Sequence, residues 1–442
     1  MRNLTSLLIV TLFVGVGCNK PTSVDIVNWS KPEVVSQSKD SIGSSFSIYK
    51  WNNTVIALNN DAGPFSVYFL QADGKTWMER AGAPSDWLPL DIDPFGNRFV
   101  TCKGSRLGDN LTVSFFTGLI CPNGDLQITA KEAWKTDKAA FFSKTGTNVS
   151  FESWNKNGPV LEPYWGGTFN GSEIFIPYCI RGNTIRDGGL MLADGPFDNG
   201  VFFSLDSGKS WQRESIDSTY SESSYVCRTK RFYYFTAGRT DENELWFSRK
   251  PVDGGAWSSP VVVTKQYATW NLAVGDGDTI HICWLDRRHE KKRFNAFNPL
   301  RKNYEVVYTH RKDSDVQWSK DVILSKGLLY AYEPVMSAEG EKIVVAWSGV
   351  QHDKDGHDSN WPNDIYYITS KDGGNTWAKP MKVTDGFKDG LTAGKAQVAL
   401  LNGVIHLFYI QGKINYKEVS SGMAKLNQPP WPIYYTQRPF PD

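Results

Sequence analysis

Residues 370–377 read Ser-Lys-Asp-Gly-Gly-Asn-Thr-Trp, and residues 204–211 repeat the pattern as Ser-Leu-Asp-Ser-Gly-Lys-Ser-Trp. In such a stretch the Asp caps backbone N–H groups of a tight turn, the Gly supplies a positive φ angle, and the Trp packs between neighbouring sheets. A shortened copy lies at 73–77, and decayed copies lie at 253–257 and 313–318. We interpret this turn motif as structural and assign no catalytic role to its aspartates.

The rest of the chain has the pattern of an all-β protein. Short runs of β-branched and aromatic residues alternate with Gly, Asn and Asp turns, and long helical periodicity is nearly absent. The turn motifs recur at intervals that suit one four-stranded sheet each. We predict an all-β fold, a β-propeller of seven blades. Six or eight blades stay open, because residues 88–160 are long enough for two, and a pair of β-sandwiches is the alternative. The six tryptophans that mark the outer hairpins are Trp77, Trp154, Trp211, Trp257, Trp318 and Trp377.

The two ends of the propeller segment are incomplete in complementary ways. Residues 29–35 look like the strand that follows a turn motif, but no strand precedes them. Near the C-terminus, three strand-like runs lack a fourth, and the last of them is at 413–418. We predict that the N-terminal strand completes the last C-terminal blade, which removes exposed sheet edges. The predicted boundaries are 26–419 for a single propeller domain and 420–442 for a loosely packed tail.

Residues 1–18 have the features of an export signal, a short basic start followed by an apolar run that is too short to span a membrane. The run ends in Gly-Val-Gly-Cys18, which resembles the lipobox of bacterial lipoproteins, although the usual Leu three residues before the Cys is absent. We predict an exported protein that is attached to the bacterial cell envelope only through a lipid on Cys18, with residues 19–25 as a linker. Asn19 is compatible with the outer membrane. An ordinary cleaved signal, which leaves a periplasmic protein, is the alternative.

The composition excludes several classes of function. The 48 Lys and Arg residues balance 47 Asp and Glu residues, and no basic block stands out, so we expect no nucleic-acid partner. The 17 Trp within an aromatic content of 14% suit both repeat cores and platforms on which sugars stack. No Cys pair has the spacing of a metal site, and we predict neither a metal nor another cofactor. The cysteines after Cys18, which we expect to be buried free thiols, are Cys102, Cys121, Cys179, Cys227 and Cys283.

Four residues between 166 and 332 follow one another in a distinctive order. Glu222 opens a strand-like run, Arg239 ends the next one, Arg301 precedes another, and Tyr332 opens a further run. This order resembles that of the base Glu, two of the three carboxylate-binding Arg residues and the catalytic Tyr in the sialidases, whose repeated turn motif is known as the Asp-box. The resemblance implies a β-propeller and an exo-glycosidase that acts on an acidic or otherwise decorated glycan.

The roles that the resemblance implies fit the chemistry of sialic acids. These sugars carry a carboxylate beside the anomeric carbon, and Arg239 and Arg301 would hold this anionic group through paired hydrogen bonds. A carboxylate nucleophile would be repelled there, so Tyr332 would attack instead, with Glu222 as its base. Tyr330 is a competing choice of nucleophile.

The chain departs from the sialidase pattern at its first catalytic blade. The Arg-Ile-Pro tripeptide of the family is absent, and Trp87 stands where the first arginine of the triad would be. Arg106 matches an additional site arginine, and Asp109 falls near the acid/base Asp, for which Asp61 is the candidate in a second alignment. The loss of a charge-assisted contact weakens the binding of a carboxylate. We therefore keep two alternatives, a non-catalytic propeller for glycan binding or assembly and a propeller-type polysaccharide lyase.

Two insertions add further candidate sites. Residues 287–293 read Arg-Arg-His-Glu-Lys-Lys-Arg and are expected to project from one face of the propeller, where they either line a pocket for an anionic glycan or form a solvated loop. Residues 351–361 mix His, Asp and Trp, but their spacing matches no defined metal motif. The glycosidase hypothesis requires the candidate residues to converge on one face of the ring, and it fails if they are scattered over both.

Overall fold

Most of the residues that the computed structural model describes are in β-strands, and none of them is in a helix. Within this part of the chain, no helix has the length and apolar character needed to cross a membrane. Residues 1–28, with the predicted export signal, Cys18 and the linker, lie outside the described residues. The described residues are 29–37, 46–51, 54–59, 66–71, 76–81, 88–92, 98–107, 110–121, 126–137, 160–163, 167–185, 191–218, 223–239, 244–266, 268–288, 304–351, 364–385, 391–413 and 432–441.

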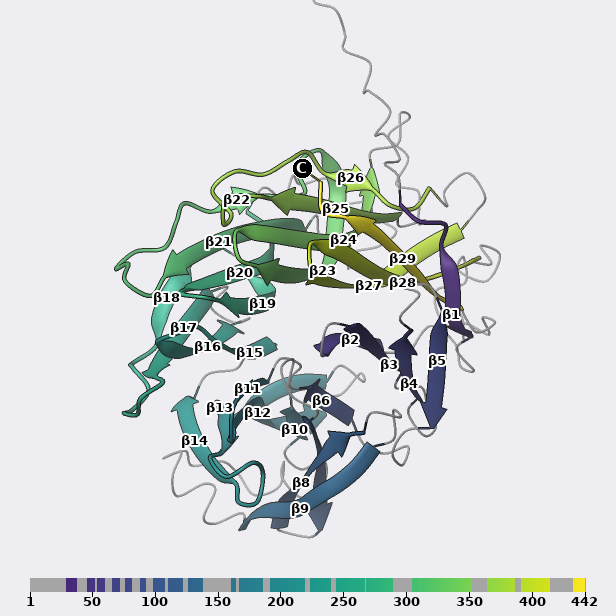
Figure 1. Ribbon diagram of the computed structural model, residues 1–442. Helices are drawn as coiled ribbons and strands as arrows, with labels where there is room; N and C mark the ends of the chain where they lie inside the picture. Colours follow the sequence, from purple (N-terminus) through teal and green to yellow (C-terminus); the bar gives the residue numbers. More distant parts are fainter. Residues whose placement is uncertain are drawn as a thin grey trace, which may run out of the picture.

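The described strands form seven antiparallel sheets arranged in a ring (Figure 1). Six sheets have four strands each, and the third has five because two short strands, β10 and β11, both pair with β12. The predicted all-β propeller of seven blades is therefore confirmed. Blades 1 to 3 comprise β2 (Phe46–Trp51), β3 (Thr54–Asn59), β4 (Ser66–Leu70) and β5 (Trp77–Ala81); β6 (Leu88–Ile92), β7 (Arg98–Leu107), β8 (Asn110–Ile120) and β9 (Leu126–Asp137); and β10 (Val160–Pro163), β11 (Thr168–Asn170), β12 (Glu173–Ile185), β13 (Met191–Ser204) and β14 (Gln212–Asp217).

The remaining blades follow the same order from the innermost strand outward. Blades 4 to 6 comprise β15 (Ser223–Arg228), β16 (Phe232–Arg239), β17 (Glu244–Pro251) and β18 (Val261–Thr264); β19 (Thr269–Asp276), β20 (Thr279–Asp286), β21 (Glu305–Lys312) and β22 (Val322–Ile323); and β23 (Leu328–Glu339), β24 (Lys342–Gln351), β25 (Asp364–Ser370) and β26 (Met381–Lys382). Blade 7 comprises β27 (Leu391–Leu401), β28 (Val404–Lys413), β29 (Pro432–Pro439) and β1 (Glu33–Gln37).

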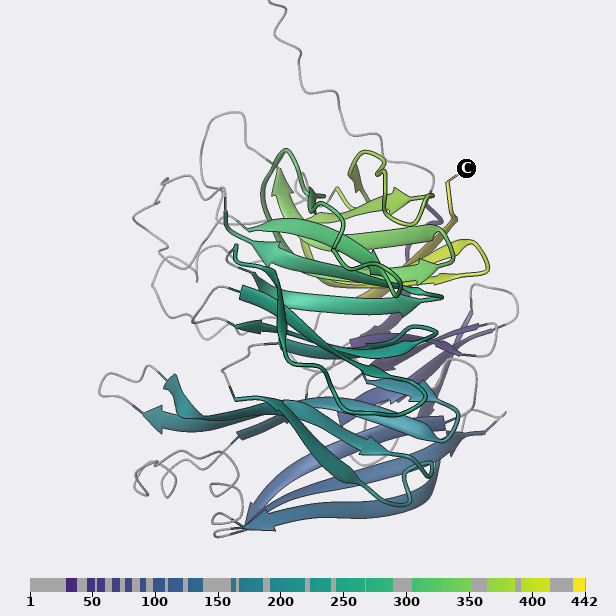
Figure 2. The ribbon, with the colours of Figure 1, turned by 90° about the vertical axis from the view of Figure 1, so that its left-hand side faces the viewer.

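The order of the strands gives the ring two faces (Figure 2). Neighbouring strands of a blade are antiparallel, so the innermost and third strands run in the same direction. The two full motif copies lie after third strands, at 204–211 between β13 and β14 and at 370–377 between β25 and β26. The innermost strands therefore end at the face with these hairpins, which we call the Asp-box face. They begin at the other face, which we call the distal face.

Both full copies of the motif make the same hydrogen bonds. The Ser204 hydroxyl accepts from the Gly208 N–H (2.7 Å) and donates to Asp206 (2.8 Å). The Asp206 carboxylate accepts from the hydroxyl (2.6 Å) and the backbone N–H (2.9 Å) of Ser210. Residues 370–377 repeat all four bonds. The bonds from Ser210, its hydroxyl first, lower the pKa of Asp206 to about 2, so this aspartate is a structural element of its turn.

Each full Asp-box also binds its blade to the preceding one. Trp211 stacks on Phe115 of β8 with ring centroids 4.0 Å apart, and Trp377 contacts Tyr308 of β21 edge-on at 4.7 Å. Gly374 lies so close to the Tyr308 hydroxyl that a Cβ atom at this position would overlap with it. The motif therefore needs glycine here for space as well as for its φ angle of 91°.

The decayed copy at 313–318 has a different role. The Asp313 carboxylate is buried and accepts hydrogen bonds from the hydroxyls of Thr229 (2.8 Å) and Tyr234 (3.0 Å), both in blade 4. It also accepts from the backbone N–H of Arg231 at 3.2 Å. Because Asp313 follows β21 of blade 5, this carboxylate bridges two blades.

The last blade differs from the sequence prediction in its third strand. The N-terminal strand closes the ring as predicted, since β1 pairs with β29 and Glu33 lies opposite Tyr435. The partner of β28, however, is β29 and not residues 413–418, so part of the predicted tail at 420–442 belongs to the sheet. Prolines at both ends of β29 made this segment look irregular, although Tyr435 inside it is buried.

The second blade settles the open blade count. Residues 88–137 form one sheet, β6 to β9. Its outer hairpin joins Ile120 to Leu126 and contains no copy of the turn motif. Trp154 was expected to mark this hairpin, which is wrong; the residue itself lies outside the described part of the chain.

Two buried histidines are each paired with a tyrosine on the neighbouring strand of their own blade. His281 contacts the Tyr308 hydroxyl at 2.7 Å, and His406 contacts that of Tyr435 at 2.9 Å. Burial lowers the pKa of His281 to about 3 and that of His406 to about 4, so both are neutral at pH 7. These two histidines are packed in the core. The five cysteines after Cys18 are free thiols, and all are buried except the half-buried Cys121.

Candidate functional site

Three adjacent innermost strands are irregular near the distal face. The pairing of β19, β23 and β27 with the next strand shifts register just after their first few residues. Each shift contains a non-glycine residue with positive φ: Trp270 (48°), Glu333 (49°) and Lys395 (54°). Such a conformation costs about 1–3 kcal/mol per residue and is concentrated at functional sites. The repetition of this strain in blades 5, 6 and 7 points to this part of the ring as a site.

The side chains at these positions form a group that we call the distal cluster, made of Trp270, Tyr332, Glu333 and Lys395. The rings of Trp270 and Tyr332 lie 5.5 Å apart at an angle of 41°, and they are 45% and 36% exposed. Lys395 Nζ lies 2.8 Å from Glu333 Oε1. The cluster thus combines an exposed aromatic surface from blades 5 and 6 with an ion pair between blades 6 and 7.

A hydrogen bond between blades 4 and 5 fixes the backbone beside Trp270. Asn271 is 1% exposed, and its side-chain oxygen accepts a hydrogen bond from the Thr236 hydroxyl of β16 at 2.8 Å. Because Asn271 is anchored between blades 4 and 5, the register shift in β19 leaves the Trp270 ring at the surface. An aromatic surface held by the backbone in this way is suited to stacking against the apolar face of a sugar.

The predicted nucleophile Tyr332 is part of the distal cluster. Its competitor Tyr330 is also in β23, but the Tyr330 side chain lies outside the described residues. Arg239 is the last residue of β16, opposite Glu244, and Arg106 is near the end of β7, opposite Leu111. The side chains of both arginines also lie outside the described part.

Four other predicted site residues stand shortly before described strands in the sequence. The strand that follows each of them in sequence begins at the distal face, namely β6 at Leu88, β8 at Asn110, β15 at Ser223 and β21 at Glu305. The described strands nearest to these residues in sequence thus begin at the distal face, and the convergence of the residues themselves stays a prediction. The residues themselves, which lie outside the described part, are Trp87, Asp109, Glu222 and Arg301.

Three members of the distal cluster were missed by the sequence analysis. Trp270 and Lys395 stand in short polar breaks at the start of strand-like runs, as in Ala-Thr-Trp270-Asn and Ala-Gly-Lys395-Ala. Glu333 is followed by a proline, which marks an irregular strand. These breaks in alternation are the signal that could have found them, because a register shift redirects side chains out of the packed face.

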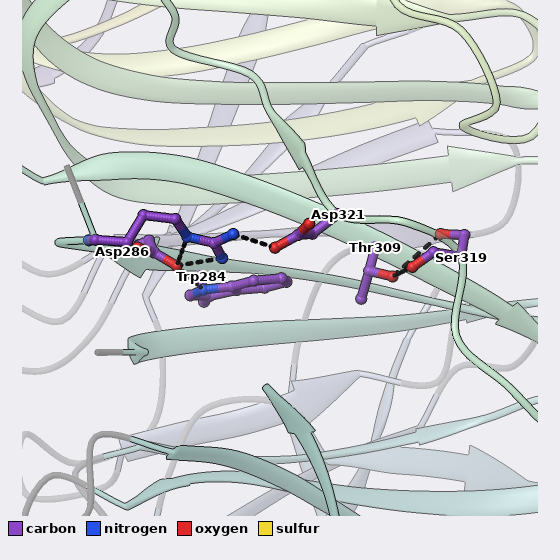
Figure 3. Close-up of polar contacts among 6 residues, drawn as sticks. Trp284, Asp286, Thr309, Ser319 and Asp321 are labelled. Atoms are coloured by element: carbon purple, nitrogen blue, oxygen red, sulfur yellow. Dashed lines mark hydrogen bonds and ion pairs between the residues drawn. The ribbon is translucent and has the colours of Figure 1, made fainter. Parts of the chain in front are cut away.

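The basic insertion is partly tied to its own blade. The guanidinium of Arg288 pairs with the fully buried carboxylate of Asp286 at 2.6 Å and also with Asp321. Asp286 accepts a further bond from Trp284 Nε1 at 3.0 Å (Figure 3). Burial opposes the charge on Arg288, but the bonds to the two aspartates outweigh it and raise the pKa. The charge of Arg288 is therefore paired within its own blade.

The same blade is held together further along its length. Figure 3 shows Thr309 of β21 beside Ser319, whose backbone oxygen accepts from the threonine hydroxyl at 2.8 Å. Residues 289–293, like the mixed His and Asp insertion from 352 onward, lie outside the described residues. Among the residues that are described, no group of three or more His, Cys, Asp or Glu could hold a metal ion.

Several solved structures are distantly similar to the chain. No protein-family model and no curated protein matches the chain. Among solved structures it is similar to the NanB sialidase from Streptococcus pneumoniae, at 11% identity over 92% of this chain and 70% of that chain, with a TM-score of 0.39. It is similar to the Trypanosoma rangeli sialidase at 12% identity over 91% and 57%, with a TM-score of 0.43. A Synechocystis apocarotenoid oxygenase mutant has 10% identity over 93% and 95%, with a TM-score of 0.36.

These neighbours include sialidases and an oxygenase, which are enzymes of unrelated chemistry. One architecture hosts many functions, so similarities at this level give no ground for an activity. The distal cluster and the residues near it are the features of this chain that bear on its function.

Proposed function

We propose that this propeller binds a glycan at its distal face and that Trp270 and Tyr332 form the stacking platform. The observation that carries the proposal is the pair of neighbouring, exposed aromatic rings, of which Trp270 has a strained backbone and Tyr332 precedes a strained residue. Large aromatic side chains are normally buried in a propeller core, as Trp246, Trp284 and Trp347 are here. Exposing two of them together in this way is typical of a binding surface.

The ion pair beside the platform supports a decorated or acidic glycan as the ligand. Lys395 is 44% exposed while paired with Glu333, whose side chain is 17% exposed. An ammonium has three N–H donors, and a carboxylate accepts several hydrogen bonds, so this pair offers both donors and acceptors to hydroxyl or carboxylate groups of a sugar. Arg239 and Arg301, if they reach the same face, add positive charge for an anionic group.

Glycan binding is tested by titrating the purified protein without residues 1–18 with a panel of natural neutral and acidic glycans. We expect Trp270→Ala to lower the affinity for the best ligand about tenfold, because a stacked aromatic contributes about 1.4 kcal/mol. The matched control is Val316→Ala, which alters a residue that is 87% exposed in the turn between β21 and β22, at the Asp-box face. Equal affinities of the wild type and Trp270→Ala would count against the platform.

A second candidate function is hydrolysis of the bound glycan, with Tyr332 as nucleophile and Glu222 as its base. The specific observation in its favour is the exposed Tyr332 at the distal face, where β15 begins directly after Glu222 and β16 ends at Arg239. A tyrosine within a binding platform is close to the bound sugar and could attack its anomeric carbon. Because a tyrosine is neutral, it does not repel an acidic sugar. Binding without cleavage stays the first proposal, because the sequence lacks the first arginine of the sialidase triad.

Hydrolysis is tested with aryl glycosides and natural acidic glycans. If Tyr332 is the nucleophile, Tyr332→Phe should lower turnover about a hundredfold or more while the affinity changes little, since the ring is retained. Trp270→Ala should instead act mainly on affinity. Turnover that survives Tyr332→Phe would exclude this residue as nucleophile. If the wild type turns over none of the substrates, the protein binds glycans without cleaving them.

A further inference from the structure

A cavity of about 340 Å³ lies in the middle of the ring, apart from the distal cluster. Its wall takes residues from the innermost strands of all seven blades, β2, β6, β11, β15, β19, β23 and β27. Several of these residues stand at or near the ends of their strands, as Lys50, Ile92 and Arg228 do. Because the innermost strands end at the Asp-box face, the cavity lies toward that face.

Among the described residues, two charged side chains line the cavity, and both are cationic: Lys50 and Arg228. Arg228 Nε is buried and has no hydrogen-bond partner in the described structure. Lys50 Nζ donates one hydrogen bond, to the backbone oxygen of Ala338 at 2.9 Å, and an ammonium has three N–H donors. The two side chains therefore bring positive charge to the wall, which a ligand with an anionic group could balance.

Two acidic side chains near Lys50 do not compensate its charge completely. The Glu339 carboxylate accepts from the backbone N–H groups of Asn402 and Gly403, both at 2.9 Å, in a hairpin of blade 7. Asp276 is itself partly buried, and burial raises its pKa. Burial lowers the pKa of Lys50 although both carboxylates act in the opposite direction. A buried cation in this state is stabilised by a nearby anion.

Apolar and polar surface contribute to the wall in nearly equal parts. Ile48, Ile92, Phe169, Met336 and Val398 contribute to it. The volume is at the small end of the range of about 300–1,000 Å³ in which small-molecule sites fall. A wall that combines apolar side chains with cationic groups suits an organic anion, which has an apolar body and a charged group.

We propose that the central cavity binds a small organic carboxylate, with its anionic group between Lys50 and Arg228 and its apolar body against Phe169 and Met336. Such a ligand would supply an acceptor for Arg228 and would cover apolar side chains of several blades at once. The site would then join the innermost strands around the axis. This proposal is independent of glycan binding, since it uses other residues near the other face.

The proposal is tested with benzoate as the probe carboxylate and benzamide as its neutral counterpart, by calorimetric titration of the full folded chain. We expect benzoate to bind at least tenfold more tightly than benzamide. Lys50→Met and Arg228→Gln should each weaken benzoate binding at least tenfold, whereas Lys50→Arg should retain it. Two controls should leave it unchanged: Lys371→Met, at an exposed lysine of the blade 6 Asp-box, and Tyr332→Phe.

Several results would overturn the proposal. Benzoate that binds no better than benzamide, or that binds equally to Lys50→Met and Arg228→Gln, would show that the two cations do not hold a carboxylate. Inorganic phosphate that binds while benzoate does not would assign the cavity to an inorganic ion. If Lys50→Met fails to fold, the comparison of benzoate with benzamide on the wild type, together with Arg228→Gln, still decides the matter.

Discussion

Replacing Gly374 by alanine should lower the free energy of unfolding by about 3 kcal/mol or more. The residue has a φ angle of 91°, which an L-residue adopts only with strain, and its Cβ atom would overlap with the Tyr308 hydroxyl. Tyr308 has little freedom to move away, because its hydroxyl contacts His281 at 2.7 Å and its ring contacts Trp377. Urea-induced unfolding, followed by fluorescence, measures the loss.

The neighbouring glycine provides the matched control. Gly373 also has a positive φ angle, 68°, but a Cβ atom there would meet no atom within 4 Å. Gly373→Ala should therefore cost only the backbone strain, about 1 kcal/mol. Equal losses in the two variants would mean that the close approach of the Asp-box to the preceding blade contributes nothing to stability.

Acidification should destabilise the propeller between pH 6.5 and 4.5 by about 5 kcal/mol through two buried histidines. Burial, with a smaller contribution from His310 in the case of His281, lowers the pKa of His281 to about 3 and that of His406 to about 4. In the unfolded chain both take up a proton near pH 6.5. Their contribution is therefore fully present above this pH, and it is lost as the pH falls toward the pKa values of the folded state.

Single variants separate the two histidines. His281→Gln and His406→Gln should each reduce the slope of unfolding free energy against pH by about 1.4 kcal/mol per pH unit in this window. The slope is the quantity to compare, since either variant will also change the stability at pH 7. A slope that neither variant alters would show that these histidines are not buried in their neutral form.

The fold could be predicted because its signal is local. The four hydrogen bonds that define the Asp-box at 370–377 join residues within that stretch. The turn can therefore be recognised from these eight residues alone. Closure by the N-terminal strand followed from counting strands at the two ends. The third strand of the last blade could not be found in this way, since β29 follows a proline-rich segment and is recognised only by its pairing with β28 and β1.

The candidate site was harder to predict because it depends on contacts between blades. Trp270 contacts Tyr332, and Glu333 contacts Lys395, although the partners lie far apart in the sequence. They come from three innermost strands that shift register at the same level of the ring. Tyr332 was found through a family resemblance, which gave its place in the order of residues but not its neighbours. Asp313 was recognised as part of a turn motif, but the motif did not show that its carboxylate bridges two blades.

Glycan binding at the distal face is tested most directly by hydrogen–deuterium exchange of the full chain, with and without the ligand that binds best. We expect the bound glycan to slow exchange at residues 269–273 and 328–335, which carry the platform, and to leave the Asp-box hairpins at 204–211 and 370–377 unchanged. The Trp270→Ala variant should lose this protection. Protection confined to the Asp-box hairpins, and retained in Trp270→Ala, would contradict a glycan site at the distal face.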